Sequence, residues 1–204
     1  MAITAADQHK SPINLKRLVI FPITAEDETT GITYGTGLEI KKTLMTATDT
    51  PATVSARNTG DGETTDVYVA VDGGQLQLGI TALTSAERVS IYGEQLDNGT
   101  NVYGAASLPP YVGVAYMTER TDGTVNLKKY PKVRFLPQAE TETEKKRDGV
   151  TFATLSLTGE YVNEAKNGAA RYVRYAVDPK TDKTVVDTWF TEGAYFKPTT
   201  TTGK

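Results

Sequence analysis

The sequence predicts a mainly β protein, with two packed β-sheets that form a sandwich or a partly closed barrel and one short α-helix beside them. Three observations favour this class. β-branched and aromatic residues, which suit a pleated and half-buried surface, are plentiful, and 11 of the 204 residues are Tyr. Short stretches of alternating apolar and polar residues recur, separated by Gly and Pro. Only one segment carries a clear helical pattern. We expect nine or ten short strands around that helix.

The first half of the chain begins with a polar stretch and then alternates between strands and turns. Residues 1–14 contain the only His and are expected to form an N-terminal arm. Strands are then expected at 15–23, 38–46, 67–71 and 75–80, the last with Leu76, Leu78 and Ile80 on one face. The turn Asp72-Gly73-Gly74 separates the last two strands.

Residues 47–66 are different, and we interpret them as a long loop. They contain few large apolar residues and carry turn signals at Asn58, Gly60 and Asp61-Gly62. Connections of about twenty residues exceed ordinary loop lengths and are usually functional or flexible. The segment is therefore a candidate for a role in binding or assembly.

The helix is expected at about 84–93. Thr84 and Glu87 have the spacing of a capping box, in which each side chain accepts a hydrogen bond from the other residue's free backbone amide. Ala86, Val89 and Tyr92 would form a narrow apolar face, and Gly93 can end the helix in a left-handed conformation. Such a short amphipathic helix should lie on a sheet.

The second half is expected to form three more strands and a final hairpin. The strands lie at 111–118, 125–135 and 150–162, with a charged connection at 138–149. Segments 171–177 and 184–190 would form a C-terminal hairpin over about 171–190, and residues 197–204 a flexible C-terminal tail. Since no composition break or repeat appears, we expect one β domain over 15–196.

The residues for the common catalytic routes and cofactor sites are missing, so we expect no enzyme, cofactor or metal. The single His9 cannot supply a Ser-His-Asp triad or a multi-histidine site, and the absence of Cys excludes thiolate ligands and disulfides. The glycines at 31–37 lack the Lys-Ser/Thr of a phosphate loop. The formal net charge of −3 argues against a strongly basic nucleic-acid surface. The sequence contains no run of about 18 apolar residues, so we expect no membrane span.

The stretch 110–161 resembles the major tail proteins, or tail-tube proteins, of long, non-contractile-tailed bacteriophages. The similar features are an apolar strand ending in a charged turn, a strand containing Lys-Tyr, an Ala-Glu-Thr-Glu linker and a strand carrying Phe152, Thr154, Leu157 and Gly159. The resemblance implies the phage tail-tube fold. It also implies a structural subunit that forms stacked hexameric rings, whose channel passes DNA into the host without specific binding.

The resemblance also assigns the long loop a role, that of stacking one ring on the next. The residues concerned are Asn58, Thr59, Gly60, Asp61, Gly62, Glu63 and Asp66. It implies a homo-oligomer that contacts other tail proteins at the tube ends, located in the virion tail and assembled in the host cytoplasm. An acidic chain suits a channel wall that must not bind phosphates.

Two other functions remain open at this point. A β-sandwich binding module for carbohydrates or surfaces could stack sugars on Trp189 and the tyrosines. A hydrolase with paired carboxylates would need two acidic side chains that converge in a cleft. Rings or tubes favour the tail protein, and a monomer at every concentration favours the binding module.

Overall fold

The computed structural model describes residues 10–41, 44–60, 63–105, 107–137 and 154–191. This part of the chain forms eleven strands and two short helices. The strands are β1 (Pro12–Asp27), β2 (Gly31–Tyr34), β3 (Leu38–Ile40), β4 (Leu44–Gly60), β5 (Glu63–Ile80), β6 (Gln95–Asp97), β7 (Thr100–Val102), β8 (Tyr111–Arg120), β9 (Val125–Phe135), β10 (Leu155–Tyr161) and β11 (Tyr172–Val177). The helices are α1 (Ser85–Tyr92) and α2 (Lys183–Trp189).

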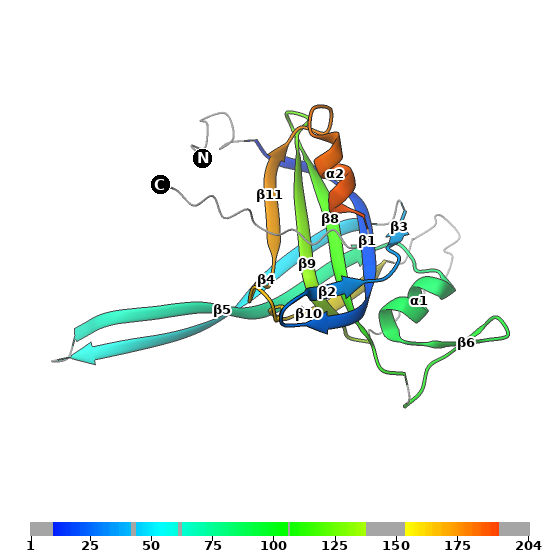
Figure 1. Ribbon diagram of the computed structural model, residues 1–204, viewed down its shortest axis with the longest axis horizontal. Helices are drawn as coiled ribbons and strands as arrows, with labels where there is room; N and C mark the ends of the chain where they lie inside the picture. The colour runs from blue at the N-terminus through cyan, green and yellow to red at the C-terminus, as the bar shows by residue number, and fades with distance from the viewer. Residues whose placement is uncertain (1–9, 42–43, 61–62, 106, 138–153, 192–204) are drawn as a thin grey trace, which may run out of the picture.

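Nine of the strands join in one antiparallel sheet, and β6 and β7 form a separate pair. The main order is β2-β1-β8-β9-β10-β5-β4, with β3 paired to β1 and β11 paired to β9. The layer of β4 and β5 crosses the layer of β1, β8 and β9 (Figure 1). The predicted mainly β, sandwich-like class is therefore confirmed, and the strands of both layers belong to the nine-stranded sheet.

Apolar residues on β1 face two different cores, because successive side chains of a strand point to opposite faces. Leu18 and Ile20 join a cluster between the layers, together with Leu76, Leu78 and Tyr130. Val19 and Phe21 point the other way, into a second cluster. That second cluster is completed by residues of β2, β8, β9, β11 and α2 and by Phe190: Ile32, Tyr34, Ala115, Val125, Leu127, Val177, Val186, Trp189 and Phe190.

Helix α1 begins at the expected cap, and its end also matches the sequence pattern. The Oγ1 of Thr84 accepts from the Glu87 amide at 3.4 Å, and Glu87 Oε2 accepts from the Thr84 amide at 2.6 Å. Gly93 adopts a left-handed conformation with φ of 67°. The buried face differs from the predicted one, because Glu87, Ile91 and Tyr92 are buried whereas Ala86 is exposed.

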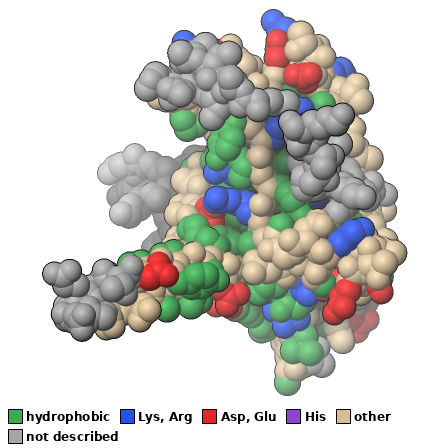
Figure 2. All heavy atoms as spheres, turned by 60° about the vertical axis from the view of Figure 1, so that its left-hand side comes forward, with side chains coloured by type: hydrophobic (Ala, Val, Ile, Leu, Met, Phe, Trp, Pro, Cys, Tyr) green, Lys and Arg blue, Asp and Glu red, His purple; other side chains and the backbone are tan. Residues whose placement is uncertain are grey.

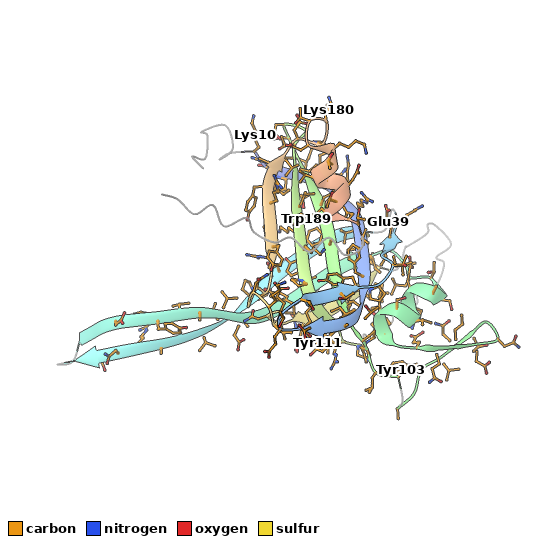
Figure 3. All side chains as sticks on the ribbon, in the orientation of Figure 1. Lys10, Glu39, Tyr103, Tyr111, Lys180 and Trp189 are labelled. Atoms are coloured by element: carbon orange, nitrogen blue, oxygen red, sulfur yellow. The ribbon has the colours of Figure 1, made fainter. Side chains whose placement is uncertain are left out.

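The expected C-terminal hairpin is wrong, because its second half is helix α2. Val186 and Trp189 lie three residues apart, so a helix places both against β9, where a strand would separate them. The indole Nε1 of Trp189 donates to the carbonyl of Lys128 at 3.3 Å, and Figure 3 shows the side chain lying between α2 and the sheet.

The expected N-terminal arm is also too long at its inner end. Residues 12–14 belong to β1, where Pro12 pairs with Arg120 and Asn14 with Glu119. The polar composition of this stretch does not predict a strand, and the residues form one because they pair with β8. Residues 1–9 with His9, the connection 138–149 and the tail 197–204 lie outside the described residues.

Candidate functional site: a projecting two-stranded arm

Beyond the sheet, β4 and β5 continue together as a two-stranded ribbon that leaves the body of the molecule (Figure 1). We call residues 52–72 the arm. Its pairing runs from Thr53 opposite Val71 to Gly60 opposite Glu63. The prediction of a loop at 47–66 is therefore wrong, because the described residues of this segment belong to strands β4 and β5. Asp61 and Gly62 lie outside the described residues. Within 47–66 the large apolar residue is Val54, and the other large apolar side chains of the arm lie on the paired strand at 67–71, so the composition of the segment resembles that of a loop.

Cross-strand pairing divides the side chains of the arm into two faces, since directly opposed residues share a face. The first, which we call the valine face, carries Val67, Val69 and Val71 opposite Arg57, Ser55 and Thr53. The second, the tyrosine face, carries Asp66, Tyr68 and Ala70 opposite Asn58, Ala56 and Val54. Each face therefore contains apolar residues.

The large apolar side chains of both faces are exposed. Tyr68 is 64% exposed, Val69 61%, and Val54, Val67 and Val71 are each more than half exposed. Figure 2 shows hydrophobic side chains gathered along the arm between its grey tip and the body. An antiparallel ribbon with one solvated face would alternate apolar with polar residues, so this arm has the composition of a ribbon covered on both faces.

The arm is anchored at Gly73 and Gly74, where the register of β4 and β5 shifts between Pro51 and Thr53. Gly73 has φ of +72°, and a Cβ there would lie 2.3 Å from the carbonyl oxygen of Tyr161. A Cβ on Gly74 would lie 2.4 Å from the Tyr161 hydroxyl. Only glycine fits this close approach of β5 to the end of β10.

A polar cluster lies beside these glycines at the root of the arm. The hydroxyl of Tyr161 donates to Oδ1 of Asp49 at 2.7 Å, and Arg171 pairs with Oδ2 of the same carboxylate. The Asp49 side chain is only 8% exposed. Burial raises the pKa of Tyr161, which keeps its hydroxyl neutral and able to donate. The Tyr161 ring packs on Tyr130 with centroids 5.1 Å apart.

Two hollows flank the arm at this root. One, of about 220 Å³, reaches Val71 and is lined also by Pro51, Tyr161, Asn163, Gly168, Ala170 and Arg171. The other, of about 420 Å³, reaches Ala52 and Asp72, which continue the tyrosine face, and is lined also by Thr50, Pro51, Gly74, Gln75, Glu160, Tyr161 and Val162. Each face of the arm thus leads into its own hollow.

The predicted stacking residues lie at the outer end of the arm. Asn58 pairs with Asp66, Thr59 with Thr64, and Gly60 with Glu63. Asp66 Oδ1 accepts a hydrogen bond from the Val67 amide at 2.8 Å.

Sequence reasoning missed the rest of the arm and its root, namely Val54, Val67, Tyr68, Val69, Val71, Asp49, Tyr161 and Arg171. The available signal was the run 67–71, in which every position is apolar, so that both faces of a strand would be apolar. Two glycines follow shortly after it. We interpreted it as a strand inside the sheet.

A second group of exposed apolar residues lies at the other end of the long axis. Leu96, Val102, Tyr103 and Leu108 belong to the β6–β7 hairpin and the segment after it, and Figure 3 shows Tyr103 directed away from the sheet. Buried Glu94 joins helix α1 to the β6–β7 hairpin through hydrogen bonds from Arg88 and Asn101. Burial opposes its ionisation, but hydrogen bonds from Arg88 and Asn101 outweigh it and lower the pKa of Glu94.

Neither a metal-binding group nor a membrane-crossing helix is found in the part of the chain that the structure describes. No three His, Asp or Glu side chains there are grouped to hold an ion. Neither described helix has the length and apolar character that crossing a membrane requires.

Comparisons with known proteins include a distant structural likeness. No protein-family model matches this chain, and no curated protein matches it. Among solved structures, it is similar to the tube-terminating cap of the anti-feeding prophage, determined by cryo-electron microscopy. The two share 11% identity with a TM-score of 0.41, over 86% of this chain and the whole of that one. A likeness this slight carries no argument about function.

Proposed function

We propose that this chain is a non-enzymatic structural subunit that polymerises into the tail tube of a long-tailed bacteriophage. The observation that carries the proposal is the arm, a ribbon of residues 52–72 with exposed apolar side chains on both faces. The resemblance of residues 110–161 to major tail proteins supports the choice of tube.

An isolated arm of this kind is poorly suited to remain alone in water. A two-stranded ribbon is marginally stable without a sheet or helix to pack on, and exposed strand edges promote association. Five large apolar side chains of the arm are more than half exposed. Covering them in an assembly removes apolar surface from water, and the rigid root aims the arm at a fixed position on the partner.

In its finer form, the proposal is that six copies form a ring, that rings stack through their arms, and that DNA passes along the channel. Closed rings satisfy exposed strand edges, and a heterologous contact between rings propagates into a tube. The net charge of −3 permits a channel wall that repels phosphates. Other tail proteins would contact the ends of the tube in the virion, and assembly would take place in the host cytoplasm.

The test is electron microscopy of the purified protein beside an arm-less variant. Deleting residues 53–71 joins Ala52 to Asp72 and leaves Pro51, Gly73 and Gly74 in place, so the root is preserved. We expect rings and tubes from the unaltered protein and no tubes from the arm-less variant. Circular dichroism of the variant provides the control for folding. A protein that stays monomeric at every concentration, or an arm-less variant that still forms normal tubes, would contradict the proposal.

The competing binding-module function loses one of its supports in the structure. Trp189, the side chain expected to stack on sugars, is only 4% exposed and lies in the second core cluster. Tyr116 and Tyr130 are likewise buried. Among the described residues, the large exposed aromatic side chains are Tyr68, Tyr103 and Tyr175, which lie on different elements and share no common platform.

A further inference from the structure

The two faces of the arm carry opposite charge. The valine face has Arg57 as its charged residue in the described part. The tyrosine face has Asp66 and Asp72, and its hollow contains Glu160. Arg57, Asp66 and Asp72 are exposed, so each face presents its charge to whatever covers it.

The charged residues of the two faces also lie at the same level of the arm. Arg57 is opposite Val67, and the next pair toward the tip is Asn58 opposite Asp66. Arg57 and Asp66 are therefore one residue apart along the ribbon, on opposite faces. Stacked sheets lie about 10 Å apart, a gap that the long arginine side chain and a carboxylate can bridge.

We infer that the arms of neighbouring copies pack on one another, the valine face of one arm against the tyrosine face of the next. This inference rests on the proposed function and names the partner of the arm. Val67, Val69 and Val71 would pack against Val54, Tyr68 and Ala70 of the other copy, and Arg57 would face its Asp66. Because the two faces differ, the contact is heterologous, and it leaves a free face at each end for further copies.

Packing between identical faces is disfavoured by the same charges. Two valine faces would bring Arg57 near the Arg57 of the second copy, and two tyrosine faces would bring the Asp66 side chains together. Like charges across an interface cost free energy and suppress that pairing. The charge distribution therefore selects unlike faces.

The size of one face explains why an arm would use both. Nine to ten residues of ribbon span about 33 Å, and two strands cover a width of about 10 Å. One face thus offers roughly 330 Å², below the roughly 800 Å² per partner of a standard stable interface. An arm covered on both faces buries about twice that area, so an arm inside a stack loses more apolar surface to water-free contacts than an arm in a dimer.

Charge reversal tests the pairing directly. Arg57→Glu and Asp66→Arg, made singly, should each raise the concentration needed for assembly about tenfold, measured by sedimentation of the polymer. The double variant restores an opposite-charge pair at every contact and should assemble within about threefold of the unaltered protein. An equimolar mixture of the two single variants should also assemble, because alternating copies then place opposite charges across every contact. Ser55→Thr, on the polar row of the valine face, is the matched control.

The outcomes separate this inference from the proposed function. Easier assembly of a mixture of Arg57→Glu and unaltered protein than of either protein alone would overturn the inference, because the new carboxylate would then meet Arg57 across two identical faces. Single variants that assemble normally would also overturn the inference. So would a double variant and a mixture that assemble as weakly as the single variants. In either case, tubes of the unaltered protein would still support the proposed function. An unaltered protein that never assembles overturns the proposed function itself.

Discussion

Gly73 and Gly74 occupy the point where β5 leaves the sheet and enters the arm. Gly73 combines a left-handed backbone with a contact too close for any side chain, because Tyr161 ends β10 directly against it. The sequence showed two adjacent glycines and predicted a turn there. The structure shows that the chain does not reverse direction at this point: β5 passes through with a register shift opposite Pro51.

Substitution of Gly73 by Ala should therefore destabilise the folded state more than the same substitution at an ordinary left-handed glycine. We expect a loss of at least about 2 kcal/mol in the free energy of unfolding, because the strain of positive φ adds to a clash with backbone. Gly123→Ala is the control, since Gly123 also has positive φ, +81°, but no atom lies within 4 Å of its Cβ position. Urea unfolding measures both. Equal losses at the two sites would show that the contact with Tyr161 is not tight in solution.

At the scale of elements, the arm and helix α2 show opposite relations to the rest of the protein. No described residue of the arm belongs to either core cluster, whereas α2 contributes Val186 and Trp189 to the second cluster. The arm is thus an element whose partners are expected outside its own chain. Helix α2 is an element whose helical form is selected by the sheet beneath it.

Removing the arm should consequently leave the fold intact. We expect the variant lacking residues 53–71 to keep its free energy of unfolding within about 1 kcal/mol, because the core residues are unchanged. Trp189→Ala, which empties a site in the second cluster, should cost about 3–5 kcal/mol. Both values come from urea unfolding of unassembled protein. A large loss in the arm-less variant would mean that the arm stabilises its own subunit.

On the scale of the whole molecule, the second core cluster encloses an ionisable group. Lys129 is 3% exposed, and its Nζ lies 5.1 Å from the ring centre of Phe21 and 5.0 Å from that of Tyr34. Burial lowers the pKa of Lys129 to about 8, and the charge of nearby Glu164 partly opposes this shift. A charged lysine in this place disfavours the folded state relative to the unfolded chain, in which the group titrates near its usual pKa of about 10.4.

The stability of the unassembled protein should therefore rise with pH above about 8. Below that pH both states hold the proton and the full cost is present; above it the folded state releases the proton first, so the unfolded state binds more protons and stability increases. The gain between about pH 8 and about pH 10 is roughly 2 kcal/mol. Burial raises the pKa of Tyr130, so above about pH 10 the ionisation of tyrosine favours the unfolded chain. The pH range of the measurement should therefore end at about 10.

Urea unfolding at several pH values between about 7 and about 10 measures this effect. Lys129→Met should flatten the rise, whereas Lys180→Met, at an exposed site near α2 (Figure 3), should keep it. A rise that persists in Lys129→Met would assign the pH dependence to other groups.

Features that depend on local chemistry could be predicted from the sequence alone. The capping box of Thr84 and Glu87 and the stop at Gly93 act within one helical turn, so their spacing is enough to predict α1. The apolar run Leu18-Val19-Ile20-Phe21 predicts a strand, and β1 lies between two cores. The mainly β class follows from many such local patterns.

Features that depend on a partner strand or surface follow from contacts between distant parts of the chain. The segment 47–66 is paired strand and not a loop because β4 and β5 keep their pairing beyond the sheet, and no local pattern encodes that register. Residues 183–189 form a helix because the sheet offers one apolar surface for Val186 and Trp189. The opposite charge of the two arm faces exists only through pairing, which places Arg57 beside Val67 and Asp66 beside Asn58.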